Sequence, residues 1–175
     1  MTETNLIFNN LNFFIMATLS KNEMREFVES LIANNAEVKT YSKFARVQAR
    51  PATIGEVIIT VLANGKKETS NAANEGDWIV TNPGGEQYIV AAAKFPKKYE
   101  PAPELGEGWY KPTGGVQKFI QLSEDTIFVC SWGEEQNINA GGFINVTDLS
   151  DIYGIAEQEF YDTYKECDDS GKFFE

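Results

Sequence analysis

The feature that most constrains this 175-residue chain is an internal repeat. Residues 76–100 align with residues 141–165 without a gap, at an offset of 65. Ordinary composition would give roughly one or two identities in such a stretch. The alignment has six: Gly76 and Gly141, Ile79 and Ile144, Tyr88 and Tyr153, Ala91 and Ala156, Phe95 and Phe160, Tyr99 and Tyr164. Self-similarity at a fixed offset predicts that one small structural unit occurs twice.

Weaker similarity extends the repeat towards the N-terminus, where the offset grows to 68 or 69 and Tyr41 aligns with Trp109. We therefore expect a first β-rich repeat over residues 41–100 and a second over residues 109–166. Residues 101–108 contain two prolines and two glycines, which is typical of a linker. Two separate domains and one shared barrel or sandwich are both compatible with this pattern.

Short apolar, β-branched runs within each repeat predict strands rather than helices. The runs at 56–62 and 126–131 each lead to a glycine turn. The runs at 77–81 and 86–90 flank an Asn-Pro-Gly-Gly segment, the composition of a hairpin loop. Phe95 and Tyr99 stand four residues apart, which indicates a helical turn that closes the core.

One helix is expected before the repeats, within residues 20–40. Ser20 and Glu23 have the spacing of a capping box, in which each side chain bonds the other residue's backbone amide. An apolar stripe at helical spacing follows, and two asparagines then supply a stop. The stripe consists of Met24, Phe27, Leu31 and Ile32, and the stop is Asn34 and Asn35.

The fold class expected is α+β, with two tandem small antiparallel β units and short helices, preceded by one amphipathic helix. We expect a poorly ordered N-terminal extension over residues 1–19 and a C-terminal tail over residues 167–175. Apolar residues make up 42% of the chain, enough to bury a core.

Composition excludes several classes of function. The chain has no histidine, which removes the commonest general base and zinc ligand. The net charge is −11, and the excess of acidic residues lies after residue 100, so we expect no nucleic-acid partner.

No apolar run is long enough to span a membrane, and we expect a cytoplasmic protein. Cys130 and Cys167 lack a metal-binding spacing, so we expect free thiols, no metal and no cofactor. Oligomeric state stays open.

Several short matches within the repeats resemble the small PGDYG-type domains of phages and prophages. The first repeat has Gly-Asp-Trp-Ile at 76–79, Gly-Glu-Gln-Tyr at 85–88, and Phe95 with Tyr99. The second keeps Gly141, Tyr153, Phe160 and Tyr164, but it lacks the aspartate and the Gly-Glu pair. The resemblance covers residues 41–165 and implies a fold and a phage-related setting, because the family has no established activity.

The first repeat carries the candidate ligand-binding residues. Asp77 and Glu86 bracket the hairpin and face each other in one arrangement; in another, Asp77 caps a turn and the neighbouring aromatics fill the core. We expect a non-catalytic module that binds a small anionic ligand or a protein partner. The alternative is an enzyme that uses Asp77 and Glu86 as its carboxylates. An acidic second repeat that docks on the basic first repeat would leave no ligand site. The candidates are Asp77, Trp78, Glu86, Tyr88, Lys66 and Lys94.

Overall fold

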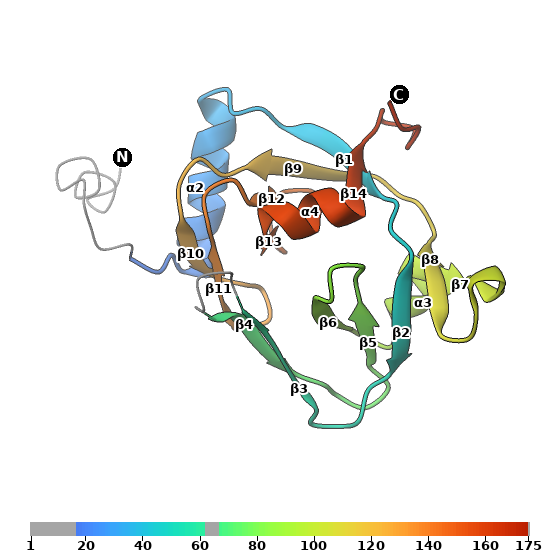
Figure 1. Cartoon of the computed structure of the whole chain (residues 1–175). Helices are drawn as coiled ribbons and strands as arrows, with labels where there is room; N and C mark the ends of the chain where they lie inside the picture. The colour runs from blue at the N-terminus through green and yellow to red at the C-terminus, as the bar shows by residue number, and fades with distance from the viewer. Residues whose placement is uncertain (1–16, 62–66, 175) are drawn as a thin grey trace.

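The computed structural model describes residues 17–61 and 67–174, and it consists mainly of antiparallel β-sheets with a few short helices (Figure 1). This agrees with the α+β class expected from the sequence. No helix in those two ranges has the length and apolarity needed to cross a membrane.

Two five-stranded sheets form the framework. The first, here called the β2 sheet, has the order β6-β5-β2-β8-β7, and the second, the β9 sheet, has the order β13-β12-β9-β1-β14. The β2 sheet contains β2 (Val47–Pro51), β5 (Trp78–Thr81), β6 (Gln87–Val90), β7 (Tyr99–Pro101) and β8 (Trp109–Pro112). The β9 sheet contains β1 (Lys39–Lys43), β9 (Gln117–Gln121), β12 (Phe143–Asn145), β13 (Tyr153–Ile155) and β14 (Tyr164–Glu166).

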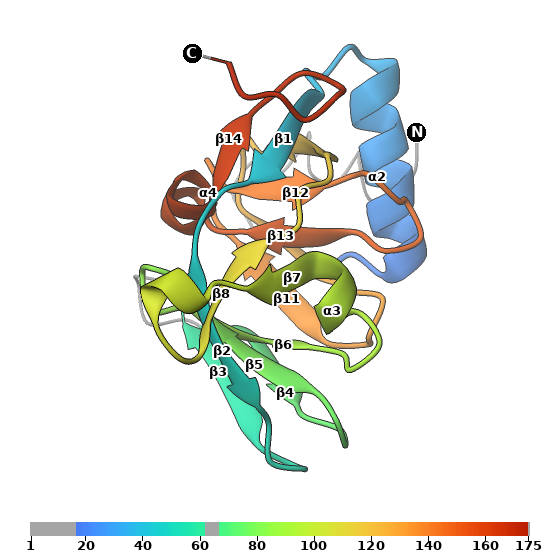
Figure 2. The same ribbon diagram turned by 90° about the vertical axis from the view of Figure 1, so that its right-hand side faces the viewer.

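The rest of the described residues form two hairpins and four helical segments. The hairpins are β3 (Val57–Val61) with β4 (Lys67–Ala72), and β10 (Thr126–Val129) with β11 (Glu135–Ile138); the helices are α2 (Lys21–Ala33), α3 (Phe95–Lys98), the 3-10 helix η1 (Pro103–Leu105) and α4 (Glu157–Thr163). The predicted strands at 56–62 and 126–131 correspond to β3 and β10, and the predicted helical turn after the first hairpin is α3. In Figure 2 the β9 sheet with α2 and α4 forms the upper part of the molecule, and the β2 sheet with α3 forms the lower part.

Each sheet takes one strand from the other half of the chain. Strand β1 directly precedes β2 in sequence, yet it pairs with β9 and β14. Strand β8 directly precedes β9, yet it pairs with β2 and β7. The sequence-based boundaries at 41–100 and 109–166 therefore do not coincide with the two sheets. Because each five-stranded sheet needs strands from both segments, neither segment can complete its five-stranded sheet alone.

The strand registers repeat at the offset found in the sequence. Trp78 pairs with Val90, and Phe143, 65 residues later, pairs with Ile155. Towards the N-terminus the register corrects the alignment by one residue. Tyr41 lies opposite Glu166 and Tyr110 lies opposite Pro101, so Tyr41 matches Tyr110 rather than Trp109. The weak sequence similarity there left the gap position undetermined.

Matching aromatic clusters hold the short helices on their sheets. Phe95 of α3 stacks on Trp78 with 4.1 Å between ring centroids, and Tyr110 meets it edge-on at 5.0 Å. Phe160 of α4 stacks on Phe143 at 3.7 Å, and Tyr41 meets it edge-on at 4.8 Å. Each cluster takes its edge-on tyrosine from the exchanged strand, so aromatic packing favours the exchange.

Helix α2 covers the core between the β9 sheet and the β10–β11 hairpin. The predicted capping box is present, and the helix ends at Ala33 with Asn34 as its C-cap, followed by Asn35 in the left-handed region with φ of 63°. Its buried residues are Met24 and Val28. The predicted stripe was wrong at its end: Ile32 is 43% exposed, because the helix turns that position towards solvent. The predicted extension lies almost entirely outside the described residues.

Candidate functional site

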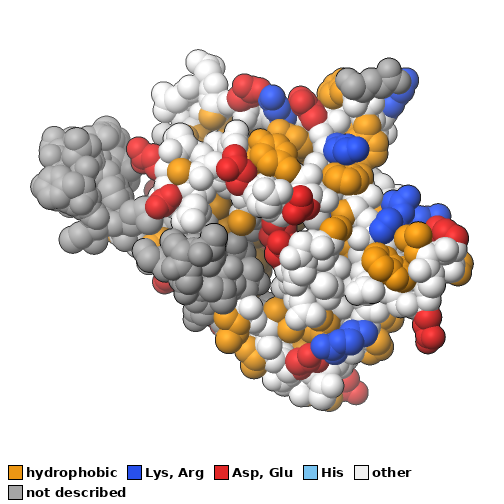
Figure 3. All heavy atoms as spheres, in the orientation of Figure 1, with side chains coloured by type: hydrophobic (Ala, Val, Ile, Leu, Met, Phe, Trp, Pro, Cys, Tyr) orange, Lys and Arg blue, Asp and Glu red, His pale blue; other side chains and the backbone are white. Residues whose placement is uncertain are grey.

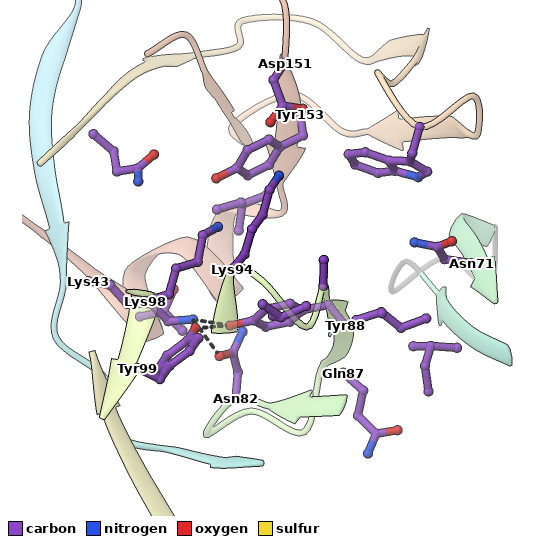
Figure 4. A pocket seen from close by; sticks show the side chains of 18 of the residues that line it. Lys43, Asn71, Asn82, Gln87, Tyr88, Lys94, Lys98, Tyr99, Asp151 and Tyr153 are labelled. Atoms are coloured by element: carbon purple, nitrogen blue, oxygen red, sulfur yellow. Dashed lines mark hydrogen bonds between the residues drawn. The ribbon is translucent and has the colours of Figure 1, made fainter. Parts of the chain in front are cut away.

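A cleft of about 670 Å³ opens between the β2 sheet and the β9 sheet (Figure 4). Its walls come from β6, α3 and β7 on one side and from β13, α4 and β14 on the other, with β1 at one end. Pockets of several hundred cubic ångströms bind small molecules in many proteins. The cleft is therefore the candidate binding site of this protein.

Lys43, the last residue of β1, lies at the centre of a buried polar network in this cleft. Its Nζ atom donates hydrogen bonds to the hydroxyls of Tyr88 and Tyr99, the latter at 2.6 Å, and to Oδ1 of Asn82 at 3.2 Å (Figure 4). The two tyrosine hydroxyls are also bonded to each other. Burial lowers the pKa of Lys43 to about 7; attraction to Glu159 opposes this shift and repulsion from Lys98 adds to it.

A second tyrosine pair, Tyr153 and Tyr164, occupies the matching positions of the β9 sheet. Burial is the main cause that raises the pKa of all four tyrosines, to about 12 for Tyr99 and well above its usual value for Tyr88 and Tyr164. All four hydroxyls therefore keep their protons near neutral pH. They can donate and accept hydrogen bonds but do not supply a phenolate base.

The lysine occurs on only one side of this symmetric arrangement. Lys43 lies opposite Tyr164 in the β1–β14 pairing, and Pro112 lies opposite Tyr99 in the β8–β7 pairing. Pro112 is thus the counterpart of Lys43. Proline offers no hydrogen-bond donor, so the two halves of the cleft differ in chemistry.

Glu159 of α4 joins the network through Asn82. The Asn82 side-chain amide donates to Oε1 of Glu159 at 3.0 Å while its oxygen accepts from Lys43. Burial raises the pKa of Glu159 to about 7, repulsion from Glu86 adds to the rise, and the Asn82 hydrogen bond and the charge of Lys43 oppose it. One oxygen of Glu86 is buried without a hydrogen-bond partner in the described part of the chain. Asn82 separates the lysine from the carboxyl group, so they form no direct ion pair.

Lys98 of α3 and Lys94, which directly precedes this helix, add positive charge to the cleft. Lys94 extends towards Asp151 and Tyr153 across the opening (Figure 4). Lys98 is exposed along its side chain, yet desolvation lowers its pKa, and repulsion from Lys94 lowers it further while Asp151 opposes the shift. Neither Lys94 nor Lys98 lies within ion-pair distance of a carboxylate among the side chains that the structure describes. Figure 3 shows acidic side chains over α4 and basic ones towards β7 and β8.

The structure distributes the candidate residues over several environments. Tyr88, Lys94 and Asp77 line the cleft. The Asp77 carboxylate also accepts a hydrogen bond from the backbone amide of Asn74 at 2.8 Å, which is the turn-capping role. Trp78 packs in the aromatic cluster of the β2 sheet.

The two remaining candidates are Glu86 and Lys66. Several residues that line the cleft were not among the candidates predicted from the sequence. Glu86 approaches the network from beside Glu159 without lining the cleft, and Lys66 lies outside the described residues. The identity of the paired tyrosines in the two repeats was a signal for Tyr99, Tyr153 and Tyr164. No local signal brought Lys43 and Asn82 together with Glu159, because Lys43 belongs to the exchanged strand and Glu159 lies in the other half of the chain.

No protein-family model, no curated protein and no solved structure matches the chain. The chemistry of the cleft therefore carries the functional argument.

Proposed function

We propose that this protein binds a small organic anion in the cleft between its two sheets. The observation that carries the proposal is the set of three lysines, Lys43, Lys94 and Lys98, which face the cleft without an ion-pair partner among the described residues. Desolvation and mutual repulsion lower the pKa values of Lys43 and Lys98. A bound anion would relieve both costs, because opposite charge stabilises the protonated lysine.

The tyrosines support a polar ligand rather than an apolar one. Four tyrosines, Tyr88, Tyr99, Tyr153 and Tyr164, line the cleft, and the hydroxyls of Tyr88 and Tyr99 bond Lys43. Each can turn its O–H towards a ligand oxygen. Trp132 lines the cleft and is 43% exposed, so it offers a face for a planar group.

The carboxylate-enzyme alternative receives less support. Asp77 already accepts a backbone hydrogen bond, and Glu86 does not line the cleft. An acidic second segment docked on the basic face of the first would fill the space between them. The open volume of about 670 Å³ argues for a ligand there instead.

The likeness of the two halves of the chain also bears on the origin of the protein. We infer that the chain arose by tandem duplication of a PGDYG-like unit, with an amphipathic helix before the first copy, and that it works in the cytoplasm. The repeated strand registers and the matched aromatic clusters support the duplication. On this interpretation, divergence of the copies left a single lysine-bearing site.

Thermal-shift screening with nucleotides, phosphate and small carboxylates tests the binding proposal. We expect at least one organic anion to raise the melting temperature of the wild type, and the Lys94→Gln/Lys98→Gln variant to lose most of that shift. The charge-matched control is Lys21→Gln/Lys172→Gln, at two positions that do not line the cleft. If no anion stabilises the wild type, or both variants respond alike, the proposal is wrong.

A further inference from the structure

We propose that Lys43 is a nucleophile that forms an imine with the carbonyl group of an anionic ligand. The inference rests on the proposed function, because it needs an anion in the cleft, and it adds a covalent step to that function. It identifies the ligand class as aldehydes or ketones that carry a carboxylate or phosphate.

The first support is the position of the amine. Lys43 lies deep in the network, and its side chain also lines a cleft wide enough for a small molecule. The partners of its Nζ atom are neutral oxygens, from Tyr88, Tyr99 and Asn82. Glu159 is reached only through the Asn82 amide. An ammonium without a direct counter-ion gives up its proton more readily than a paired one.

The second support is the neighbouring cation. Lys98 lies close enough that its charge adds to the effect of burial, and the pKa of Lys43 falls to about 7 in spite of the attraction of Glu159. Desolvation and an adjacent positive charge are the two ways in which proteins activate lysine as a nucleophile towards carbonyl compounds. At neutral pH about half of Lys43 is then the free amine, whereas an exposed lysine is neutral in roughly one molecule in a thousand or fewer.

The surrounding groups fit each step of the reaction. The Nζ lone pair attacks the carbonyl carbon, a C–N bond forms, the C=O π bond breaks, and a proton moves from nitrogen to oxygen to give a carbinolamine. Loss of that hydroxyl with a proton releases water and leaves the C=N bond, so no oxidant or reductant is needed. Tyr88 and Tyr99 remain protonated and can donate to the leaving oxygen. Lys94 and Lys98 are placed to hold the anionic end of the ligand.

If Lys43 were needed only to satisfy a buried tyrosine pair, we would expect a lysine at the equivalent position in the other half of the molecule. The matching position there is Pro112, so no lysine stands at the crossover position beside Tyr99. The fold therefore accepts a residue without an ammonium at that position. This asymmetry favours a chemical role for Lys43.

Reductive trapping tests the inference. The full chain is incubated at pH 7 with glyoxylate, a small anionic aldehyde, and cyanoborohydride, and peptide mass spectrometry then measures the modified fraction of each lysine. We expect Lys43 to be modified at least tenfold more than the exposed Lys21. Lys98→Gln, a change at an exposed side chain, should reduce Lys43 modification at pH 7 at least threefold, with recovery at pH 9. The matched control Lys21→Gln should leave Lys43 modification unchanged.

The neutral probe acetaldehyde separates this inference from anion binding. Preferential modification of Lys43 by both aldehydes supports the role of Lys43 as a nucleophile. If glyoxylate is preferred over acetaldehyde and this preference disappears in Lys94→Gln, the result also supports anion binding in the cleft. If Lys43 reacts no faster than Lys21 with either aldehyde, or if Lys98→Gln has no effect at pH 7, the inference is overturned. The thermal-shift screen would still decide the binding proposal, so the two can fail separately.

Discussion

Replacing Lys43 by methionine should abolish an unusual pH dependence of stability. The pKa of Lys43 is about 7 in the folded protein and 10.5 at its ordinary value. Between these values the unfolded chain binds more protons than the folded one, so the free energy of unfolding rises with pH. The slope approaches about 1.4 kcal/mol per pH unit, and the gain between pH 7 and pH 9.5 is at most about 3 kcal/mol. Methionine has a similar length and no charge, so the variant should lack this rise.

The titration of Glu159 should have the opposite effect: below pH 7 it makes the free energy of unfolding fall as the pH rises. Its pKa is raised from 4.5 to about 7 in the folded protein, so its contribution is fully present below pH 4.5 and is lost as the pH rises through about 7. The wild type should therefore be least stable near pH 7. Glu159→Gln should remove the acid limb and retain the alkaline limb, and Lys43→Met should do the reverse.

Urea denaturation at constant ionic strength, in steps from pH 4.5 to 9.5, measures the free energy of unfolding on both limbs: its fall below pH 7 (the acid limb) and its rise above pH 7 (the alkaline limb). The comparison of wild type with each variant cancels the titration of groups elsewhere in the chain. An alkaline limb of equal slope in the wild type and Lys43→Met would refute the reasoning, since the rise would then come from other groups. A wild-type stability that is flat between pH 7 and 9.5 would show that Lys43 remains charged in the folded state.

Three further substitutions test the packing by the same denaturation assay at pH 8. Phe160→Ala should cost about 4 kcal/mol because the ring is fully buried between aromatic neighbours, whereas Tyr161→Ala, at a side chain 53% exposed, should cost less than about 1 kcal/mol. Gly154→Ala should cost about 1–3 kcal/mol, because the new Cβ would meet Ile138 Cγ1 at 2.4 Å, and combination with Ile138→Ala should be less than additive. Ser20→Ala removes the cap of α2 and should cost about 1 kcal/mol; a loss below a few tenths would mean that the capping box contributes little.

The elements that could be predicted from the sequence are those whose signals are local. The hairpin of β5 and β6 is marked by its Pro-Gly-Gly loop, and the limits of α2 are marked by Ser20 and by Asn34. In each case a few neighbouring residues determine the backbone conformation.

The arrangement of the strands could not be predicted in the same way. If the two repeats are alike, β1 has two equivalent places. It can pair with strands of its own repeat or with the matching strands of the other repeat, with the same register in both cases. Local preference does not distinguish these states, because the pairing partners are far apart in sequence. The short connections from β1 to β2 and from β8 to β9, and the packing of Tyr41 on Phe160, select the exchanged state only in three dimensions.

The exchange also explains why the candidate site is assembled from distant residues. Lys43 is the last residue of β1, at the point where the chain leaves the β9 sheet to enter the β2 sheet. Its backbone is therefore held against Tyr164 while its side chain reaches Tyr88 and Tyr99 of the other sheet. The same crossover at the end of β8 holds Pro112. The two crossovers therefore carry different residues at matching positions: the amine of Lys43 at one, and Pro112, which has no hydrogen-bond donor, at the other.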